Sequence, residues 1–462
     1  MSDSAGTDHE SRKTQVSYGI GDLGNTVINS AIQFFLMKFY TDAALVAPAL
    51  AGNALLFGRI WDAVKDPYFG WITDRLRLRV GKRRIFMIFF AISMAISFAL
   101  LWFIPPVNRF WTFVWIALIF IVFDTLWTLT NVSHDPLQSE LTGDYDERTS
   151  LTAYRMVMAV PAYLIGAALT PAIVGLFALQ RTGFGLIGVV YGILAAVVLL
   201  VSISGTRGRT RLAGTRPEAL PFKSLVGAFK NGSFIWLGGT YFIVNMSFAF
   251  AKVLMAYYVQ YQLQMRAEIS LVIGLMLICV PASFPLWQRL ARKMDKARAY
   301  AIGIGVGGLA LFVAFFLPHA STPLIYIVSV LLGLSFAAHW IFPLSMLADV
   351  VDFDRLETGH QRGNMFYGVW GLGIKVSEAL ALVMVGWILS GFGYVPNVEQ
   401  APIALLGIRL FFGLLPSLCI FLSLYLLFKY PITRQSHAEI LLKKEAMDKV
   451  AVEITDERIQ NL

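Results

Sequence analysis

Two aspartates lie four residues apart in a segment whose other residues suit the interior of a membrane. In FGRIWDAVKDPYFGWITDR, residues 57–75, Asp62 and Asp66 share one face of a helix, and Arg59 and Lys65 lie beside them. Two carboxylates at this spacing offer hard oxygen ligands to a small cation, and their mutual repulsion favours holding a proton instead. One interpretation of the pattern is therefore a site for Na⁺ or H⁺ at Asp62 and Asp66.

The same four residues also fit an internal salt-bridge ladder. Arg59 to Asp62 and Asp62 to Lys65 are both three residues apart, and the two positive charges balance the two negative ones. A charge at the centre of a spanning helix costs about 2.5–3.5 kcal/mol on insertion scales, so four of them require partners, water or a ligand. The residues alone leave both interpretations open.

Polar residues follow the helical spacing i, i+4, i+7, i+11 along two further apolar segments. The first set is Asp22, Thr26, Asn29 and Gln33, and the second is Asp124, Thr128, Asn131 and Asp135. Each set forms one face of a helix, and a polar face in a lipid-spanning helix points to the protein interior. Such a face contacts other helices or lines an aqueous cavity. Because two such faces occur in addition to the charged segment 57–75, we favour the cavity.

Other charged or aromatic residues lie singly in apolar segments. They are Arg155, Lys252, His339, Trp340, Lys375 and Glu378. Lys375 and Glu378 are spaced as an i, i+3 pair, and each of the six also fits a purely structural contact. The basic members suit an anionic substrate.

Membrane-spanning helices must position these residues. The 462-residue chain is 57% hydrophobic and only 15% charged, which indicates an all-α integral membrane protein. Its apolar runs are long enough to cross roughly 30 Å of hydrocarbon. We expect twelve spans, at residues 16–42, 47–73, 85–105, 110–138, 150–177, 183–204, 233–261, 267–288, 298–318, 322–348, 364–391 and 402–429.

A long polar interruption divides the spans six and six. We therefore expect two six-helix bundles, residues 16–204 and 233–429, joined by a cytoplasmic linker, residues 205–232. Residues 1–15 form a cytoplasmic N-terminus and residues 430–462 a cytoplasmic tail. The net charge of +9 does not indicate nucleic-acid binding, because the basic residues follow the second, sixth and eighth spans on one side of the membrane. The positive-inside rule places both termini in the cytoplasm.

Four motifs together resemble one transporter family. They are SYGIGDLGN, RIWDAVKDPYFGWITDRLRLRVGKRR, SELTGDYDERTSLTAYR and MLADVVDFDRLETGHQRGNMFYGVWGLGIK. The chain resembles the glycoside–pentoside–hexuronide:cation symporters of the major facilitator superfamily from about residue 16 to 429. The resemblance implies two six-helix bundles around a central cavity, with substrate bound at mid-membrane and access alternating between the two sides.

The resemblance also implies roles for particular residues. Asp62 and Asp66 match the pair that holds Na⁺, H⁺ or Li⁺, and Thr128 matches a hydroxyl that assists the ion. Arg155 and Lys375 match residues that connect the ion and sugar sites, and Trp340 matches a tryptophan that lines the sugar site. We expect the remaining charges to form a network around these sites, namely Arg59, Asp22, Asp124 and Glu378.

The chain also departs from the pattern of the melibiose permeases in that family. Lys65 stands where they have an asparagine that helps bind Na⁺, and an ammonium there could take the space and charge of the cation. We therefore hypothesise coupling to H⁺ or to no ion. Thr26 and Asn131 stand where those permeases have galactoside-binding aspartates, and Asp135 stands where a tryptophan would stack on the sugar. Galactoside specificity is therefore not expected.

The sequence thus predicts a secondary active transporter of the inner membrane that couples a glycoside, pentoside or hexuronide to Na⁺ or H⁺. The absence of a GxxxxGK[ST] motif argues against direct ATP-driven transport. A lysophospholipid symporter of the same fold is the alternative, and a membrane-embedded enzyme or a sensor is disfavoured. We expect a monomer with no cofactor beyond the coupling ion, whose partners are a small-molecule substrate and the lipid bilayer.

Overall fold

Twelve helical columns run side by side in the part of the chain that the structure describes. The computed structural model describes residues 12–75, 80–134, 141, 145–206, 226–319, 323–360, 362–433 and 435. These residues are helical apart from the short connections, and no strand occurs among them. Because lipid offers no hydrogen-bond partners, helices that satisfy their own backbone are the expected solution for so apolar a chain.

The first six columns form one bundle. They are α1 (Arg12–Lys38) continued by η1 (Phe39–Ala43); α2 (Pro48–Arg75); α3 (Val80–Leu101); α4 (Arg109–His134); α6 (Tyr145–Tyr163) continued by η2 (Leu164–Leu169) and α7 (Thr170–Gly175); and α8 (Gln180–Gly205). Helix α1 packs against α6 and α8, α3 packs against α4 and α8, and α2 packs against α4.

The last six columns form the second bundle after a short turn, η3 (Val226–Lys230). They are α10 (Gly232–Tyr257) continued by η4 (Tyr258–Gln262); α11 (Ile269–Ala282) and α12 (Phe284–Lys293), preceded by η5 (Arg266–Glu268); α13 (Lys296–Phe316); α14 (Leu324–Thr358); α15 (Gly363–Gly391); and α16 (Pro402–Arg409) continued by η6 (Leu410–Leu414) and α17 (Leu415–Phe428). Helix α10 packs against α15 and α17, and α14 packs against α11 and α13.

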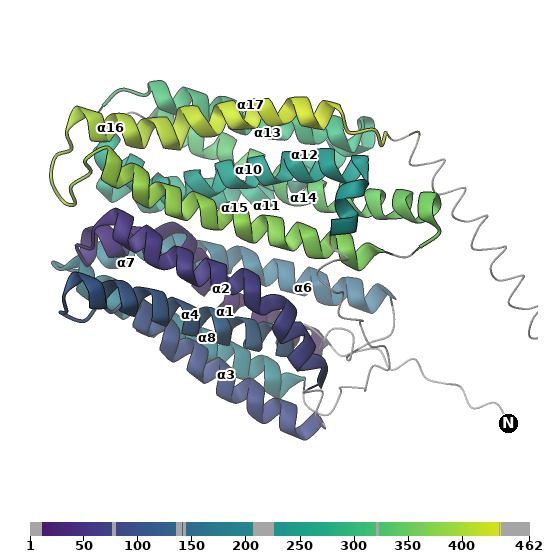
Figure 1. Ribbon diagram of the computed structural model, residues 1–462, viewed down its shortest axis with the longest axis horizontal. Helices are drawn as coiled ribbons and strands as arrows, with labels where there is room; N and C mark the ends of the chain where they lie inside the picture. Colours follow the sequence, from purple (N-terminus) through teal and green to yellow (C-terminus); the bar gives the residue numbers. More distant parts are fainter. Residues whose placement is uncertain are drawn as a thin grey trace, which may run out of the picture.

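The two bundles lie against one another along their length (Figure 1). Helix α2 contacts α15, α1 contacts α10, and η2 contacts α11. The α2–α15 contact is close because Gly386 has no side chain: a Cβ there would lie 2.6 Å from the carbonyl oxygen of Pro48. The prediction of an all-α membrane protein with twelve helices in two six-helix bundles is confirmed.

Not every column is apolar enough to be recognised as a span from hydropathy alone. Eight described helices meet a combined test of length and hydropathy, and the bent pair α11–α12 makes nine. Helices α1 and α2 do not meet it, and both carry polar residues described above. The described apolar part of α3 is short, Phe86–Leu101.

Two predicted spans differ from the structure in their shape or length. Residues 267–288 were expected as one helix, but α11 and α12 meet at an angle of 44°. Pro285, at the start of α12, lacks an amide hydrogen and crowds the preceding turn, which accounts for the bend. Helix α14 runs ten residues beyond the predicted end and stops at Gly359, whose φ of 70° gives a left-handed cap.

The predicted boundaries between domains fall partly outside the described residues. Residues 1–11, 207–225 and 436–462 are not among them. They include most of the predicted N-terminus, linker and tail. The division into residues 1–15, 16–204, 205–232, 233–429 and 430–462 therefore stays a prediction.

Candidate functional site

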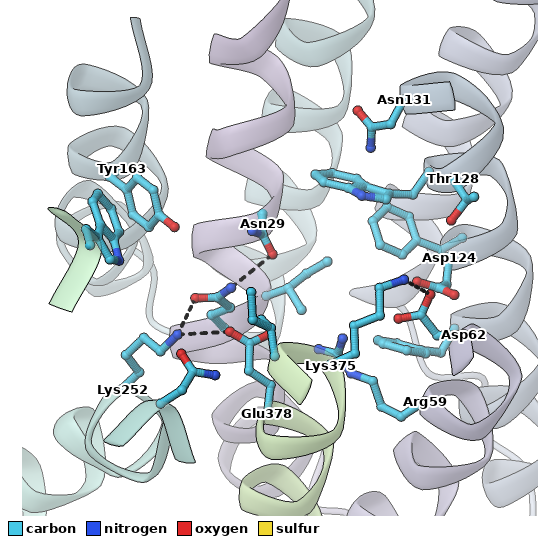
Figure 2. Close-up of a pocket in the computed structure, with 18 of the residues that line it drawn as sticks. Asn29, Arg59, Asp62, Asp124, Thr128, Asn131, Tyr163, Lys252, Lys375 and Glu378 are labelled. Atoms are coloured by element: carbon cyan, nitrogen blue, oxygen red, sulfur yellow. Dashed lines mark hydrogen bonds and ion pairs between the residues drawn. The ribbon is translucent and has the colours of Figure 1, made fainter. Parts of the chain in front are cut away.

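A cavity of about 600 Å³ lies between the two bundles (Figure 2). Side chains from α1, α2, α4 and α6 line one part of it, and side chains from α10, α14 and α15 line the other. A pocket of this size and position suits a small-molecule substrate. Both bundles contribute charged groups, so any relative movement of the bundles changes the electrostatics of the cavity.

Lys65 lies between two carboxylates at one side of the cavity. Its ammonium donates to Asp62 Oδ1 at 2.6 Å and also to Asp124 Oδ2. Lys375, from the other bundle, donates to the same Asp62 Oδ1 at 2.8 Å. Lys65 is only 1% exposed, so its charge is held entirely by protein groups. Helices α2, α4 and α15 are therefore joined by one charge cluster.

This cluster resolves part of the choice between a salt-bridge ladder and a cation site. The Asp62–Lys65 rung of the ladder forms, but Arg59 instead lies over the Phe120 ring at 5.5 Å. Its Nε atom is buried and has no hydrogen-bond partner among the described residues. Within the described part of the chain, no three His, Cys, Asp or Glu side chains are grouped as a metal site. The side chain of Asp66 lies outside the described residues, so its role as an ion ligand stays a prediction.

A second polar cluster crosses between the bundles, to the left of Asp62 in Figure 2. Lys252 on α10 donates to Gln33 Oε1 on α1 at 2.8 Å and to Glu378 Oε1 on α15 at 3.3 Å. Gln33 in turn donates to Asn29 Oδ1 at 3.3 Å. Lys375 and Glu378, which are spaced as a pair on one helix, therefore each have a partner on another helix.

Aromatic side chains stand next to this second cluster. The rings of Tyr163 and Trp340 lie 5.3 Å apart, and Trp340 also meets Phe336 at 5.7 Å. The Lys252 ammonium lies 5.8 Å from the Phe336 ring. Trp340 keeps 36% of its surface exposed, as a residue that faces a cavity should. The cavity therefore offers an aromatic surface beside a positive charge.

The polar face of α4 reaches the cavity as predicted, whereas that of α1 does so only in part. Thr128 and Asn131 line the cavity, and Asn131 Oδ1 accepts from Asn25 Nδ2 at 2.7 Å. Thr26 is half-buried and is not among the lining residues. Asp135 lies outside the described residues.

Arg155, expected at the substrate site, is engaged elsewhere in this conformation. Its guanidinium makes a bidentate pair with Asp22 at 3.0 and 2.9 Å and donates to the Tyr18 hydroxyl at 3.2 Å. These bonds join α6 to α1 within one bundle. Bidentate pairing of this kind is strong and directional, which makes Arg155 and Asp22 a brace between two helices.

Several lining residues were not assigned to the site from the sequence. Tyr163, Tyr241 and Asn245 are among them, and Lys252 was noted only as a scattered charge. Asn245 Nδ2 donates to Ser377 Oγ at 2.6 Å, and Tyr241 stacks on Trp370 at 4.0 Å. The spacing of Asn245 and Lys252 on one helix face was the available signal.

The chain matches the family described as "MFS/sugar transport protein" over residues 17–434. An uncharacterized symporter of Synechocystis is 26% identical, covering 94% of this chain and 96% of the relative. The sodium-dependent lysophosphatidylcholine symporter 1 of Gallus gallus is 26% identical, over 92% of this chain and 88% of the relative. A sphingosine-1-phosphate transporter of Xenopus tropicalis is 27% identical, over 92% and 89%.

Solved structures show the same fold at low identity. The nucleoside transporter NupG superposes with a TM-score of 0.64 at 13% identity, covering 90% of this chain and 100% of that one. A bacterial homologue of peptide transporters gives 0.60 at 14% identity, over 90% and 97%. With the family match, these likenesses confirm the expectation of a multi-pass transporter rather than an enzyme. The chain belongs to the MFS/sugar transport protein family and is a symporter of the major facilitator type.

Proposed function

We propose that this symporter carries a polar, sugar-like substrate with an acidic group, and that H⁺ rather than Na⁺ drives it. The observation that carries the substrate proposal is the aromatic pair Tyr163–Trp340 beside the Lys252 ammonium, inside a cavity with polar walls. Aromatic faces pack against the apolar faces of sugar rings, while amides and charged groups bind hydroxyls and carboxylates.

The walls of the cavity suit a hydrophilic ligand better than an acyl chain. Among the described lining residues, Ile32 and Ile374 are the only aliphatic ones. Amide side chains come from both bundles, including Asn29, Asn131 and Asn245. An acyl chain would displace water from these amides and make no hydrogen bond with their remaining donors and acceptors, which is unfavourable.

Lys252 is the group we assign to the acidic part of the substrate. Its contact with Glu378 is 3.3 Å, longer than its 2.8 Å bond to the neutral amide of Gln33. A substrate carboxylate could therefore bind the ammonium without breaking a short ion pair. Charge-assisted bonds of this kind are about twice as strong as neutral ones, so they can discriminate acids from neutral sugars.

Lys65 is the basis of the coupling proposal. Its ammonium lies between the carboxylates of Asp62 and Asp124, where a bound metal cation would otherwise balance their charge. A tethered cation cannot leave with the substrate, so the mobile coupling ion must be another species. We infer that a carboxylate of this cluster takes up a proton when Lys375 withdraws from Asp62 as the bundles move.

The lysophospholipid alternative is supported by relatives whose names state lysophosphatidylcholine and sphingosine-1-phosphate as their substrates.

We propose that the protein lies in the inner membrane with both termini in the cytoplasm, because the basic loops are all expected on one side of the membrane.

A ligand screen separates the two substrate classes. Purified protein is heated with methyl glucuronide, methyl glucoside or lysophosphatidylcholine, each with and without Na⁺. Ligand at about 100 times its dissociation constant adds roughly 2.7 kcal/mol of stability, which a melting curve resolves. We expect stabilisation by the glucuronide, less by the glucoside, and no effect of Na⁺. Stabilisation by lysophosphatidylcholine alone would replace the sugar proposal with the lipid one.

Replacing Lys252 with methionine should remove the preference for the acid while leaving the neutral sugar bound. Methionine keeps the bulk of the side chain but not its charge. We therefore expect glucuronide affinity to fall roughly tenfold or more, which corresponds to a loss of about 1.4 kcal/mol or more in binding free energy. Lys296→Met is the matched control, because Lys296 pairs with Asp349 between α13 and α14 and does not line the cavity. Equal loss of both ligands in Lys252→Met would show that the residue only holds the bundles together.

A further inference from the structure

The seam between α1 and α10 joins residues that occupy equivalent positions in two repeated segments. Gln33 bonds to Lys252, and Asp42 bonds to Tyr261; in both pairs the partners are separated by 219 residues. The Lys38 ammonium lies 4.6 Å from the centre of the Tyr257 ring, and these two residues have the same separation.

The backbone shows that this separation marks a structural repeat. Both first helices end in a π-helical turn, Phe39–Ala43 and Tyr258–Gln262. Each turn is followed by a residue other than glycine with positive φ, Leu45 at 56° and Gln264 at 54°. These features match residue for residue at the separation of 219. Equivalent residues that contact one another lie on a pseudo-two-fold axis, as in an isologous interface.

At the end of this axis the two bundles are joined by a buried cluster around Asp42. Its Oδ2 accepts from Tyr261 at 2.8 Å and from Lys38 at 2.7 Å, and its Oδ1 accepts from Tyr394 at 2.5 Å. Thr41 Oγ1 lies 2.7 Å from Asp42 Oδ1. We call Asp42 with Tyr257, Tyr261 and Tyr394 the clasp.

The bonds of the clasp extend over the connection after α15. Thr41 Oγ1 lies 2.7 Å from the Tyr257 hydroxyl, and Asn397 Nδ2 donates to the Asp42 carbonyl at 2.7 Å. Asp42 is 2% exposed and Lys38 is 4% exposed. Tyr394 also lines a separate cavity of about 500 Å³, together with Arg109 and Arg181. Tyr394 therefore contacts both Asp42 and this second cavity.

The charges of the clasp are arranged unequally between the bundles. Lys38 and Asp42 are an i, i+4 ion pair on one helix, so both ionised groups belong to the first bundle. The second bundle contributes tyrosine hydroxyls and an amide. Separating the bundles here would break bonds from neutral donors and the contacts of the Lys38 ammonium with the Tyr257 and Tyr261 rings, but no ion pair. The Lys38–Asp42 pair could move as a unit. A buried ion pair across the seam would be far harder to separate reversibly.

We propose that the clasp is the gate that closes this end of the transport path, and that opening it breaks no ion pair. Gln33 and Lys252, which line the cavity, are on the same two helices about 13 Å from the Asp42–Tyr261 pair. Substrate that binds Lys252 therefore acts on the same seam that the clasp closes. The proposal does not depend on the nature of the substrate.

Pulsed electron spin resonance can measure whether the clasp holds this end closed. Spin labels are attached at Val107→Cys and Val398→Cys, two exposed positions on opposite bundles, in a Cys279→Ala/Cys419→Ala background. We expect Tyr261→Phe/Tyr394→Phe to increase the population with the longer distance by about fivefold or more, because the double variant loses two charge-assisted hydrogen bonds to the Asp42 carboxylate. If the double variant does not fold, the same distance is measured in each single variant.

Tyr258→Phe is the matched control. Tyr258 is in the same π-turn, but its hydroxyl donates to the Ala314 carbonyl within its own bundle. We expect its distance distribution to equal that of the parent. The proposal is overturned if the double variant, or both single variants, keep the parent distribution, or if Tyr258→Phe opens this end equally.

Discussion

Lys65→Asn is expected to create a Na⁺ response that the native chain lacks. The Lys65 ammonium is bound to both Asp62 and Asp124 and is shielded from solvent. Removing one partner from a buried ion pair typically costs 3–5 kcal/mol, because a charge is left without compensation. In the variant two carboxylates face a small polar side chain, which is a suitable setting for Na⁺. Without Na⁺ we therefore expect a large loss of thermal stability.

Adding Na⁺ should restore much of that loss. Na⁺ at about 100 times its dissociation constant contributes roughly 2.7 kcal/mol, measured as a shift of the melting curve that K⁺ does not reproduce. Lys296→Asn breaks the Lys296–Asp349 pair away from the cavity and controls for the loss of any ion pair. If Lys65→Asn is indifferent to Na⁺, the ammonium does not stand in for a cation.

Asp62→Asn is expected to abolish accumulation of substrate against its gradient. Asp62 Oδ1 accepts from Lys65 and from Lys375, so this single oxygen links the two bundles. An amide in its place leaves two ammonium groups without this carboxylate. A disturbance of 3–5 kcal/mol corresponds to roughly 10²- to 4 × 10³-fold in an equilibrium. We expect uphill uptake to fall by about this factor, while exchange of substrate across the membrane without a gradient persists.

Asp349→Asn provides the comparison, because Asp349 pairs with Lys296 and lies outside the cavity lining. It should retain most of the uphill uptake. If Asp62→Asn accumulates substrate as well as the native chain does, the bond to Lys375 has no part in coupling.

Helix positions and one polar face could be predicted because they depend on local spacing. The polar positions of α4 recur with helical period, and three of them, Asp124, Thr128 and Asn131, line the cavity. Partners across the molecule could not be predicted in this way. Asp124 is 59 residues from Lys65, and nothing in the spacing within α2 indicates that contact.

Spacing along one helix also did not indicate the partners that Lys375 and Glu378 have on other helices. Lys375 and Glu378 are neighbours on one helix face, but exposed pairs at this spacing contribute only a few tenths of a kcal/mol. Lys375 bonds to Asp62, and Glu378 accepts from Lys252. Both bonds lie inside a cavity, where electrostatic interactions are stronger than at an exposed surface. The residue-by-residue register of the bundle repeat could not be predicted either, because the repeat preserves backbone turns and positions while residue types differ, as with Asp42 and Tyr261.

The most direct test of H⁺-coupled transport is uptake of a radiolabelled methyl glucuronide into proteoliposomes under one imposed ion gradient at a time. We expect accumulation when the gradient is of H⁺, and no increase when Na⁺ is added. A Na⁺ gradient that drives accumulation of the same size, with Lys65 intact, would contradict it.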